Sequence, residues 1–220
     1  MLPMLNEDRE HMVAIQIEAR GITDQLVLEA MRAVPRERFV PAALARFAYE
    51  DRPLPIGEGQ TISQPYIVAV MTRAAGLKLG ARVLEIGTGS GYGAAVLSRI
   101  AAEVYTVERV GALAEEARER LARLGYANVH VLEGDGTLGW AEHAPYDAIV
   151  VTAGGPRVPQ ALLSQLAAGG GRLIMPVGPG AGHQRLVRVT RTDAQEYRYE
   201  DLEEVAFVPL IGAEGWTEGG

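Results

Sequence analysis

The chain has 220 residues, a length typical of one globular domain, and it contains no cysteine. The missing cysteine excludes disulfides, a thiolate nucleophile, cysteine-type zinc sites and iron–sulfur clusters. The net charge of −7 argues against nucleic-acid binding, and no apolar run reaches the roughly 20 residues of a membrane span. The first ten residues lack a signal-peptide pattern, so we expect a cytoplasmic protein.

The N-terminal part of the chain predicts helices. Apolar residues recur at helical spacing over residues 6–31 with a break at Gly21, so two helices are expected, the first capped by Asn6. Prolines scattered through residues 34–60 predict turns and a short helix there. Pro65 suits the first position of a third helix.

After Gly80 the pattern changes to strands that alternate with helices. Strands are expected at residues 82–86, 103–107, 128–132, 146–152 and 171–176, with less regular ones at 185–190 and 202–209. Helices are expected from the turn after the first strand to Ile100 and at residues 111–125 and 158–167, with a glycine-rich loop at 178–182. This alternation predicts an α/β fold with a doubly wound, mostly parallel sheet. We expect a single domain, with a helical extension at 1–79 and the cofactor-binding core at 80–220.

The first strand leads into the glycine-rich turn Gly87-Thr88-Gly89-Ser90-Gly91. Glycines let the chain turn sharply and let a ligand approach the main chain, and open α/β sheets bind ligands at the carboxyl ends of strands. The dinucleotide fingerprint would need glycine at position 92, where this chain has Tyr92. Glu85 would repel a pyrophosphate but would stabilise a cation such as S-adenosylmethionine. The spacing of Glu85 and the glycines resembles the first motif of class I methyltransferases.

Two further carboxylates follow the next strands. Glu108, 21 residues after Gly87, is placed to accept hydrogen bonds from ribose hydroxyls; the alternative is a solvated surface position. Asp135 is placed to accept the adenine amino group, with Gly136 letting the ring approach; the alternative is a simple turn pair. Three acids at successive strand ends favour a binding site over chance.

A segment at residues 53–69 narrows the substrate class. It contains the run Gly59-Gln60-Thr61-Ile62-Ser63, which closely resembles the signature of the protein-L-isoaspartate (D-aspartate) O-methyltransferases. That family repairs isomerised aspartyl residues. Matches at residues 34–36, 48–51, 144–148 and 170–178 extend the resemblance over nearly the whole chain. It implies the Rossmann-like fold of class I S-adenosylmethionine-dependent methyltransferases.

The resemblance also implies an activity and a set of site residues. The expected reaction transfers a methyl group from S-adenosylmethionine to the α-carboxyl group of L-isoaspartyl residues, with D-aspartyl residues as a further candidate, and leaves S-adenosylhomocysteine. Ser63 matches the active-site serine and acts with Thr61. The expected cofactor-binding residues are Gln60, Ile62, Glu85, Gly87, Thr88, Gly89, Gly91, Glu108, Asp135 and Gly136. The expected substrate-binding residues are Val205, Phe207, Val208, Pro209 and Leu210. Val68 stands where some members have histidine.

Three other functions stay open as alternatives. A methyltransferase of another carboxylate or a small molecule would not need the Gly59–Ser63 run. A NAD-dependent oxidoreductase is disfavoured by Glu85 and Tyr92, and a non-catalytic cofactor-binding module by the intact acids. The substrate carboxylate is already ionised at pH 7, so Ser63 is expected to orient it, and the alternative is capping of the helix at Pro65. We expect a monomer that binds isoaspartyl proteins and peptides, and no metal, nucleic acid or membrane.

Overall fold

The computed structural model describes residues 2–180, 183–193 and 196–217; part of the predicted glycine-rich loop, residues 181–182, lies outside them. The α-helices are α1 Leu2–His11, α2 Gln25–Ala33, α3 Pro65–Ala75, α4 Tyr92–Leu97, α5 Gly111–Arg123 and α6 Gln160–Ser164. The chain also contains a π-helical segment, η1 Met12–Ile17, and the 3-10 helices η2 Glu18–Arg20, η3 Arg36–Phe39, η4 Ala42–Phe47, η5 Gly136–Leu138 and η6 Ala141–His143. The strands are β1 Leu54–Gly57, β2 Gln60–Ile62, β3 Arg82–Ile86, β4 Glu103–Glu108, β5 Val129–Glu133, β6 Ala148–Val151, β7 Arg172–Val177, β8 Gln184–Arg191 and β9 Tyr197–Val205.

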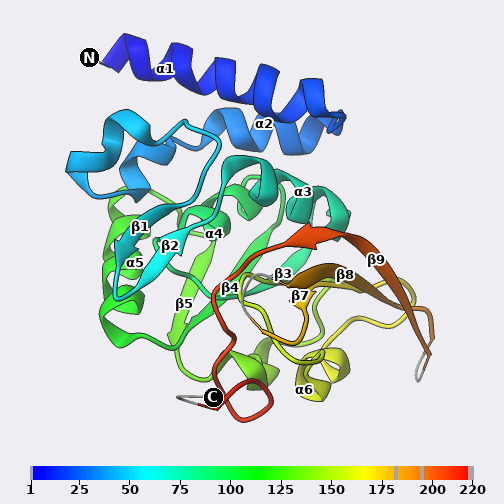
Figure 1. Ribbon diagram of the computed structural model, residues 1–220. Coiled ribbons are helices and arrows are strands. Elements are labelled where there is room, and N and C mark those ends of the chain that lie inside the picture. Colours follow the sequence, from blue (N-terminus) through cyan, green and yellow to red (C-terminus); the bar gives the residue numbers. More distant parts are fainter. Residues whose placement is uncertain (1, 181–182, 194–195, 218–220) are drawn as a thin grey trace.

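The main sheet has seven strands in the order β5-β4-β3-β6-β7-β8-β9 (Figure 1). Strands β3 to β7 pair in parallel, and β8 and β9 join antiparallel at one end. From β3 the chain builds outward through β4 and β5, and then returns to place β6 on the other side of β3. The carboxyl ends of β3 and β6 therefore form the topological switch point, where open α/β sheets bind ligands. The predicted doubly wound, mostly parallel sheet is confirmed.

Each face of the sheet carries its own hydrophobic core, because successive side chains of a strand point to opposite faces. Val83 and Val150 belong to a core that includes buried residues of α2, α3 and α4. Leu84 and Ile149 belong to a second core that includes residues of α6. By this alternation Glu85 lies on the same face as Val83, under α4.

The N-terminal elements form an outer layer, in which α2 packs onto α3 and α4 and η1 packs onto α3 (Figure 1). Leu28 and Met31 of α2 are fully buried in this layer. The ring of Phe39 packs edge-on against that of Tyr92 in α4, with 5.6 Å between the ring centroids. The extension is thus fixed to the helix that follows the glycine-rich turn, which lets it form one wall of the site.

Two predictions about the N-terminal part are wrong. Asn6 does not cap the first helix, because α1 already begins at Leu2. Residues 54–57 were expected in a turn region, but they form β1 and pair antiparallel with β2. The sequence pattern did not predict this hairpin because of Pro55, since proline is usual in turns and is tolerated in sheets mainly on edge strands. The hairpin delivers Gln60 and Ile62 to the edge of the site.

The strand predicted at residues 202–209 is present, but its predicted bounds are wrong. The strand runs from Tyr197 to Val205, so residues 206–208 leave the sheet. The segment 197–205 is polar on both faces, and charge pairs hold it to β8: the Arg188 guanidinium lies 3.0 Å from Glu200. A charged edge strand gives no hydrophobic alternation for sequence reasoning to detect.

In the described parts of the chain, no helix is long and apolar enough to cross a membrane.

Candidate active site

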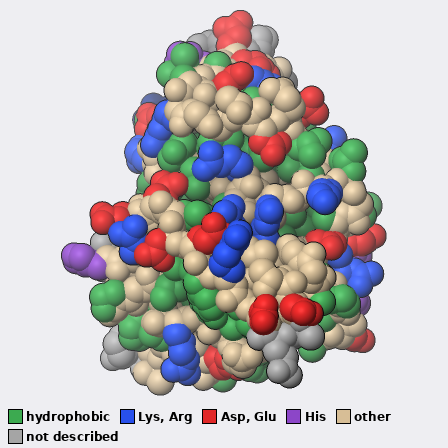
Figure 2. Space-filling model, turned by 90° about the vertical axis from the view of Figure 1, so that its right-hand side faces the viewer, with side chains coloured by type: hydrophobic (Ala, Val, Ile, Leu, Met, Phe, Trp, Pro, Cys, Tyr) green, Lys and Arg blue, Asp and Glu red, His purple; other side chains and the backbone are tan. Residues whose placement is uncertain are grey.

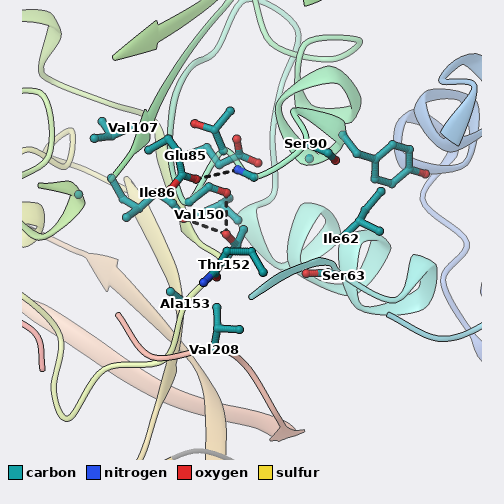
Figure 3. Close-up of a pocket in the computed structure, with 18 of the residues that line it drawn as sticks. Ile62, Ser63, Glu85, Ile86, Ser90, Val107, Val150, Thr152, Ala153 and Val208 are labelled. Atoms are coloured by element: carbon teal, nitrogen blue, oxygen red, sulfur yellow. Dashed lines mark hydrogen bonds between the residues drawn. The ribbon is translucent and has the colours of Figure 1, made fainter. Parts of the chain in front are cut away.

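Several stretches of chain line a cavity of about 220 Å³ at the switch point. They include residues 60–63 in β2 and directly after it, residues 87–90 in the turn after β3, residues 107–110 around the end of β4, residues 152–153 after β6, and residues 208–211. Figure 3 shows Glu85 and Val208 on opposite sides of Thr152. The predicted site residues that line the cavity are Gln60, Thr61, Ile62, Ser63, Glu85, Gly87, Thr88, Gly89, Glu108, Gly136, Val208, Pro209 and Leu210. Gly91, Asp135, Val205 and Phe207 are not among the lining residues.

Glu85 is a buried carboxyl group at the inner end of the cavity, with only 1% of its surface exposed. The Thr106 hydroxyl donates to its Oε2 at 2.6 Å, and Thr106 in turn shares a hydrogen bond with Thr88. Burial raises the pKa of Glu85 to about 8; the Thr106 hydrogen bond lowers it, and the charge of Glu108 raises it. A cation in the cavity would stabilise the ionised form of this carboxyl.

Gly93 makes the space for the Glu85 carboxyl group. A Cβ atom at position 93 would lie 2.2 Å from Glu85 Oε1. We therefore expect Gly93→Ala to lower the free energy of unfolding by ~1–3 kcal/mol, the usual cost of overpacking. In a Glu85→Ala background the same change should be neutral or stabilising, since alanine favours a helix over glycine by ~1 kcal/mol. Urea unfolding of the four proteins in this cycle measures the coupling, and equal effects of Gly93→Ala in both backgrounds would contradict the contact.

Glu108 fixes the glycine-rich turn. Its Oε2 accepts a hydrogen bond from Gly89 N at 2.8 Å, and its Oε1 accepts one from Val110 N at 2.9 Å. Only 7% of Glu108 is exposed, so the alternative of a solvated surface position is wrong. The carboxylate ties the turn after β3 to the end of β4 and lines the cavity beside it.

Replacing Glu108 with alanine should weaken cofactor binding by about tenfold or more, because a charged hydrogen-bond acceptor is removed. The unfolding midpoint should also fall, since Gly89 N and Val110 N lose their acceptor. Isothermal titration with S-adenosylmethionine measures the first effect. The matched control is Glu133→Ala, which removes the exposed acid paired with Glu108 in the sheet register. An unchanged affinity in Glu108→Ala would reject the ribose assignment.

Gly87 lets the turn pass close to β6. Its φ is 92°, in the region that favours glycine, and a Cβ there would lie 2.4 Å from Thr152 Oγ1. The Thr152 hydroxyl donates to the carbonyl of Gly87 at 2.8 Å, and Ile86 O lies 3.0 Å from the same hydroxyl. The turn after β3 is thus held from β4 by Glu108 and from β6 by Thr152.

Asp135 is occupied by contacts within the chain. Its Oδ1 accepts from the main-chain N–H and the hydroxyl of Thr137, and its Oδ2 accepts from Ala213 N at 2.8 Å. Burial raises its pKa, but these hydrogen bonds outweigh burial and hold the pKa below its usual range. Asp135 therefore forms the local turn that the sequence analysis gave as the alternative to an adenine contact. Gly136, the next residue, lines the cavity.

Ser63 lies on the wall formed by the connection between β2 and α3 (Figure 3). The capping alternative is wrong, because the N-cap of α3 is Gln64, and this end of the helix has no side-chain cap hydrogen bond. Thr61 and Ile62 lie on the same wall, with Thr61 exposed and Ile62 buried. Val68, at the position where some members of the resembled family have histidine, also lines the cavity and offers no polar contact there.

The last lining segment is held by main-chain hydrogen bonds inside the chain. Gly154 N donates to Val208 O at 2.8 Å, and Leu210 N donates to Gly154 O at 2.8 Å. Phe207 bonds through both main-chain groups to Gln184. These main-chain groups are therefore not available for a ladder with a substrate peptide.

Sequence reasoning missed Thr106 and Thr152. Both are hydroxyl residues at the carboxyl ends of strands next to β3, and they hold Glu85 and the turn. The signal that finds Thr106 is the strand register, which pairs it with Glu85. That register requires knowing that β4 is the neighbour of β3, which the local pattern does not state.

Charge is mixed on the face that Figure 2 shows, where basic and acidic side chains lie next to one another. Opposite charges are paired across β8 and β9: Arg185 lies 3.0 Å from Asp201, and Arg188 bonds to Glu200. Among the residues that the structure describes, no three His, Asp or Glu side chains cluster closely enough to hold a metal ion.

Comparison with known proteins gives a consistent result. Residues 7–215 match the family model of protein-L-isoaspartate (D-aspartate) O-methyltransferase. The chain is 63% identical over 209 residues to protein-L-isoaspartate O-methyltransferase 1 of Rhodopseudomonas palustris, covering 95% of this chain and 85% of that one. It is 63% identical to protein-L-isoaspartate O-methyltransferase 2 of Pelobacter propionicus, covering 94% of this chain and 92% of that one.

Solved structures agree with these sequence matches. A protein-L-isoaspartate O-methyltransferase superposes with a TM-score of 0.83 at 33% identity, covering 94% of this chain and 67% of that chain. A second structure, described as the protein from Plasmodium falciparum in complex with S-adenosyl-L-homocysteine, superposes with a TM-score of 0.79 at 26% identity. That match covers 92% of this chain and 98% of the other. The fold is that of the class I S-adenosylmethionine-dependent methyltransferases.

Proposed function

The chain belongs to the protein-L-isoaspartate (D-aspartate) O-methyltransferase family, and from this premise we propose how its cavity performs methyl transfer. The enzyme methylates the α-carboxyl group of L-isoaspartyl residues in damaged proteins and peptides, with S-adenosylmethionine as methyl donor. The observation that carries this assignment is that the Gly59–Ser63 run and the glycine-rich turn contribute to the same cavity. A general methyltransferase needs only the turn.

The residues at the inner end of the cavity fit S-adenosylmethionine. The buried Glu85 carboxyl suits a cationic ligand, and Glu108 beside the turn offers acceptor oxygens for ribose hydroxyls. Gly87, Thr88 and Gly89 present main chain rather than bulk to a ligand. When bound, the cofactor supplies an electrophilic methyl group on a sulfonium. Gly136 lines the side assigned to the adenine, and Asp135 would support that side through η5.

Ser63 and Thr61 are placed to orient the substrate carboxylate. An isoaspartyl α-carboxylate is ionised at pH 7, so it needs no general base, and the enzyme's task is to position it and keep water away. Hydroxyl groups can hold a carboxylate by hydrogen bonds without neutralising its charge. We assign Ser63 as the residue that holds it and Thr61 as a second hydroxyl at the same wall.

The substrate peptide would lie against residues 208–210. Val208, Pro209 and Leu210 line the cavity opposite Glu85, whereas Val205 ends β9 and Phe207 is turned to Gln184. The backbone of this segment is held by Gly154, so its position is fixed before a peptide arrives. A fixed apolar edge suits a substrate whose flanking side chains vary, and D-aspartyl sites are a further candidate.

We also propose that the enzyme works in the cytoplasm as a monomer, without metal, nucleic acid or membrane. The mixed charge on the face of Figure 2 supports the absence of nucleic acid, since nucleic-acid binders carry a basic face. Residues 1–79 and 80–220 act as one domain, because a continuous hydrophobic core includes residues of both.

Labelling with methyl-labelled S-adenosylmethionine tests the assignment. An isoaspartyl peptide should take up label, while small dicarboxylic acids of similar size to its reactive residue should not. Label on the small acids alone would favour the methyltransferase of another carboxylate. Cofactor binding without transfer to either would favour a non-catalytic module.

A further inference from the structure

Gln184 is a buried side chain that the cofactor and carboxylate roles above do not use. It is the first residue of β8 and only 2% of its surface is exposed. Phe207 N donates to its Oε1 at 2.7 Å, and its Nε2 donates to Phe207 O at 3.2 Å. The side-chain amide thus satisfies both main-chain groups of one residue, as a neighbouring strand would.

The hydrogen bonds between Gln184 and Phe207 begin where the ladder between β8 and β9 ends. Gln184 is also the ladder partner of Val205, the last residue of β9. Two residues further on, the chain has left the sheet, and the Gln184 side chain replaces the missing strand. Phe207 therefore has a fixed position although it belongs to no strand.

Gly154 leaves space for the Gln184 amide, and its main chain forms hydrogen bonds with residues 208 and 210. A Cβ at position 154 would lie 2.1 Å from Gln184 Nε2. Gly154 bonds to Val208 O and Leu210 N, and the Trp216 indole donates to Gly154 O at 3.0 Å. The contacts run without a gap from Gln184 to the residues that line the cavity.

We propose that Gln184 is a positioning residue for peptide binding: its amide sets Phe207 so that residues 208–210 form the substrate-side wall. This inference rests on the proposed function, because it assigns these residues to the peptide. Gln184 does not line the cavity, so it acts through Phe207 and not by touching substrate.

The chain contains a matched control for this role. Gln165 is also buried, with 6% exposed, and also clamps main chain: Trp140 N donates to its Oε1 and its Nε2 donates to Leu138 O. Gly139 lies against its amide as Gly154 lies against that of Gln184. Neither Leu138 nor Trp140 lines the cavity, so this clamp differs from the first mainly in what it positions.

The experiment measures KM for an isoaspartyl peptide and for S-adenosylmethionine in Gln184→Met, Gln184→Glu, Gln165→Met and Gln165→Glu, each well below its unfolding temperature. In Gln184→Met the peptide KM should rise about tenfold, as the loss of two hydrogen bonds predicts, with the KM for S-adenosylmethionine changed by less than about twofold. The Gln165 variants should lose stability without this rise in peptide KM.

The pH profile of Gln184→Glu separates positioning from a loss of folding. An ionised carboxylate would face Phe207 O, which is also an acceptor, whereas a protonated carboxyl can donate to it. Relative to wild type, the peptide KM of this variant should fall as the pH is lowered, and that of Gln184→Met should not. If Gln184→Met does not fold, the pH profile of Gln184→Glu still tests whether Gln184 positions Phe207.

Three outcomes would overturn the inference: a peptide KM that rises no more than in the Gln165 variants, a parallel rise in both KM values, or a Gln184→Glu profile that follows wild type. A wild-type enzyme that does not label the isoaspartyl peptide would instead contradict the proposed function. The two failures are therefore distinguishable.

Discussion

Replacing Glu85 with glutamine should weaken S-adenosylmethionine binding at pH 8 by about 10- to 100-fold, the usual cost of removing a charged partner. The wild-type carboxyl has a pKa of about 8 when no cation is bound, so at lower pH it must release a proton to pair with the cofactor. The wild-type affinity should therefore rise with pH up to 8, by at most about tenfold per pH unit. The affinity of Glu85→Gln should not depend on pH in this range.

The same substitution should change how stability depends on pH. The folded pKa of Glu85, about 8, lies above its ordinary value of 4.5. Its contribution to the free energy of unfolding is fully present below about pH 4.5 and is lost as the pH rises through 8. Urea unfolding of the free protein should therefore show Glu85→Gln gaining on wild type from pH 5 to 8.5.

Controls make the Glu85 result specific. Glu116→Gln changes an exposed carboxylate on α5 and should leave both profiles unchanged. S-adenosylhomocysteine keeps the ammonium group but lacks the sulfonium, so its pH slope tells which charge lowers the pKa. Parallel profiles for wild type and Glu85→Gln would show that the carboxyl does not meet the cation.

Replacing Ser63 with alanine should lower kcat for an isoaspartyl peptide by about 10- to 100-fold, because a misplaced reactant loses that much rate. The Kd for S-adenosylmethionine should change by less than about twofold, since the cofactor turn does not depend on this hydroxyl. The unfolding midpoint should also hold, because Ser63 does not cap α3. Steady-state kinetics with both substrates, together with cofactor titration, separates these quantities.

Ser164→Ala is the control for Ser63. Its hydroxyl bonds to Ala161 O within α6, away from the cavity, and its loss should not affect kcat. An effect of Ser63→Ala that appears mainly in cofactor affinity would place Ser63 on the wrong ligand. An unchanged kcat would leave the carboxylate without its assigned partner.

The cofactor side of the site could be predicted from sequence because its determinants are local. Glu85 and the glycines lie within one strand and its following turn, and their spacing states what the backbone does there. Glu108 is the last residue of the next strand, β4, and parallel strands bring their carboxyl ends to one edge of the sheet. Such local spacings can be recognised in a single sequence without knowing the tertiary contacts.

The substrate side could not be predicted in detail because tertiary contacts place it. Phe207, beyond the end of β9, is held by the side-chain amide of Gln184, and Asp135 holds Ala213 across 78 positions in the chain. The charged strand β9 has no hydrophobic alternation and forms through pairing with β8. No local pattern encodes these long-range contacts, which is why the strand predicted at 202–209 differs from β9 at both ends.

Methylation of the isoaspartyl α-carboxyl group is tested most directly with two peptides that differ only in the linkage of one aspartyl residue. Each is incubated with the enzyme and methyl-labelled S-adenosylmethionine, and base-labile label is counted. Label is expected on the isoaspartyl peptide, where the α-carboxylate is free, and only background on the aspartyl peptide. Equal labelling of the pair, or no labelling of either, would contradict the proposed function.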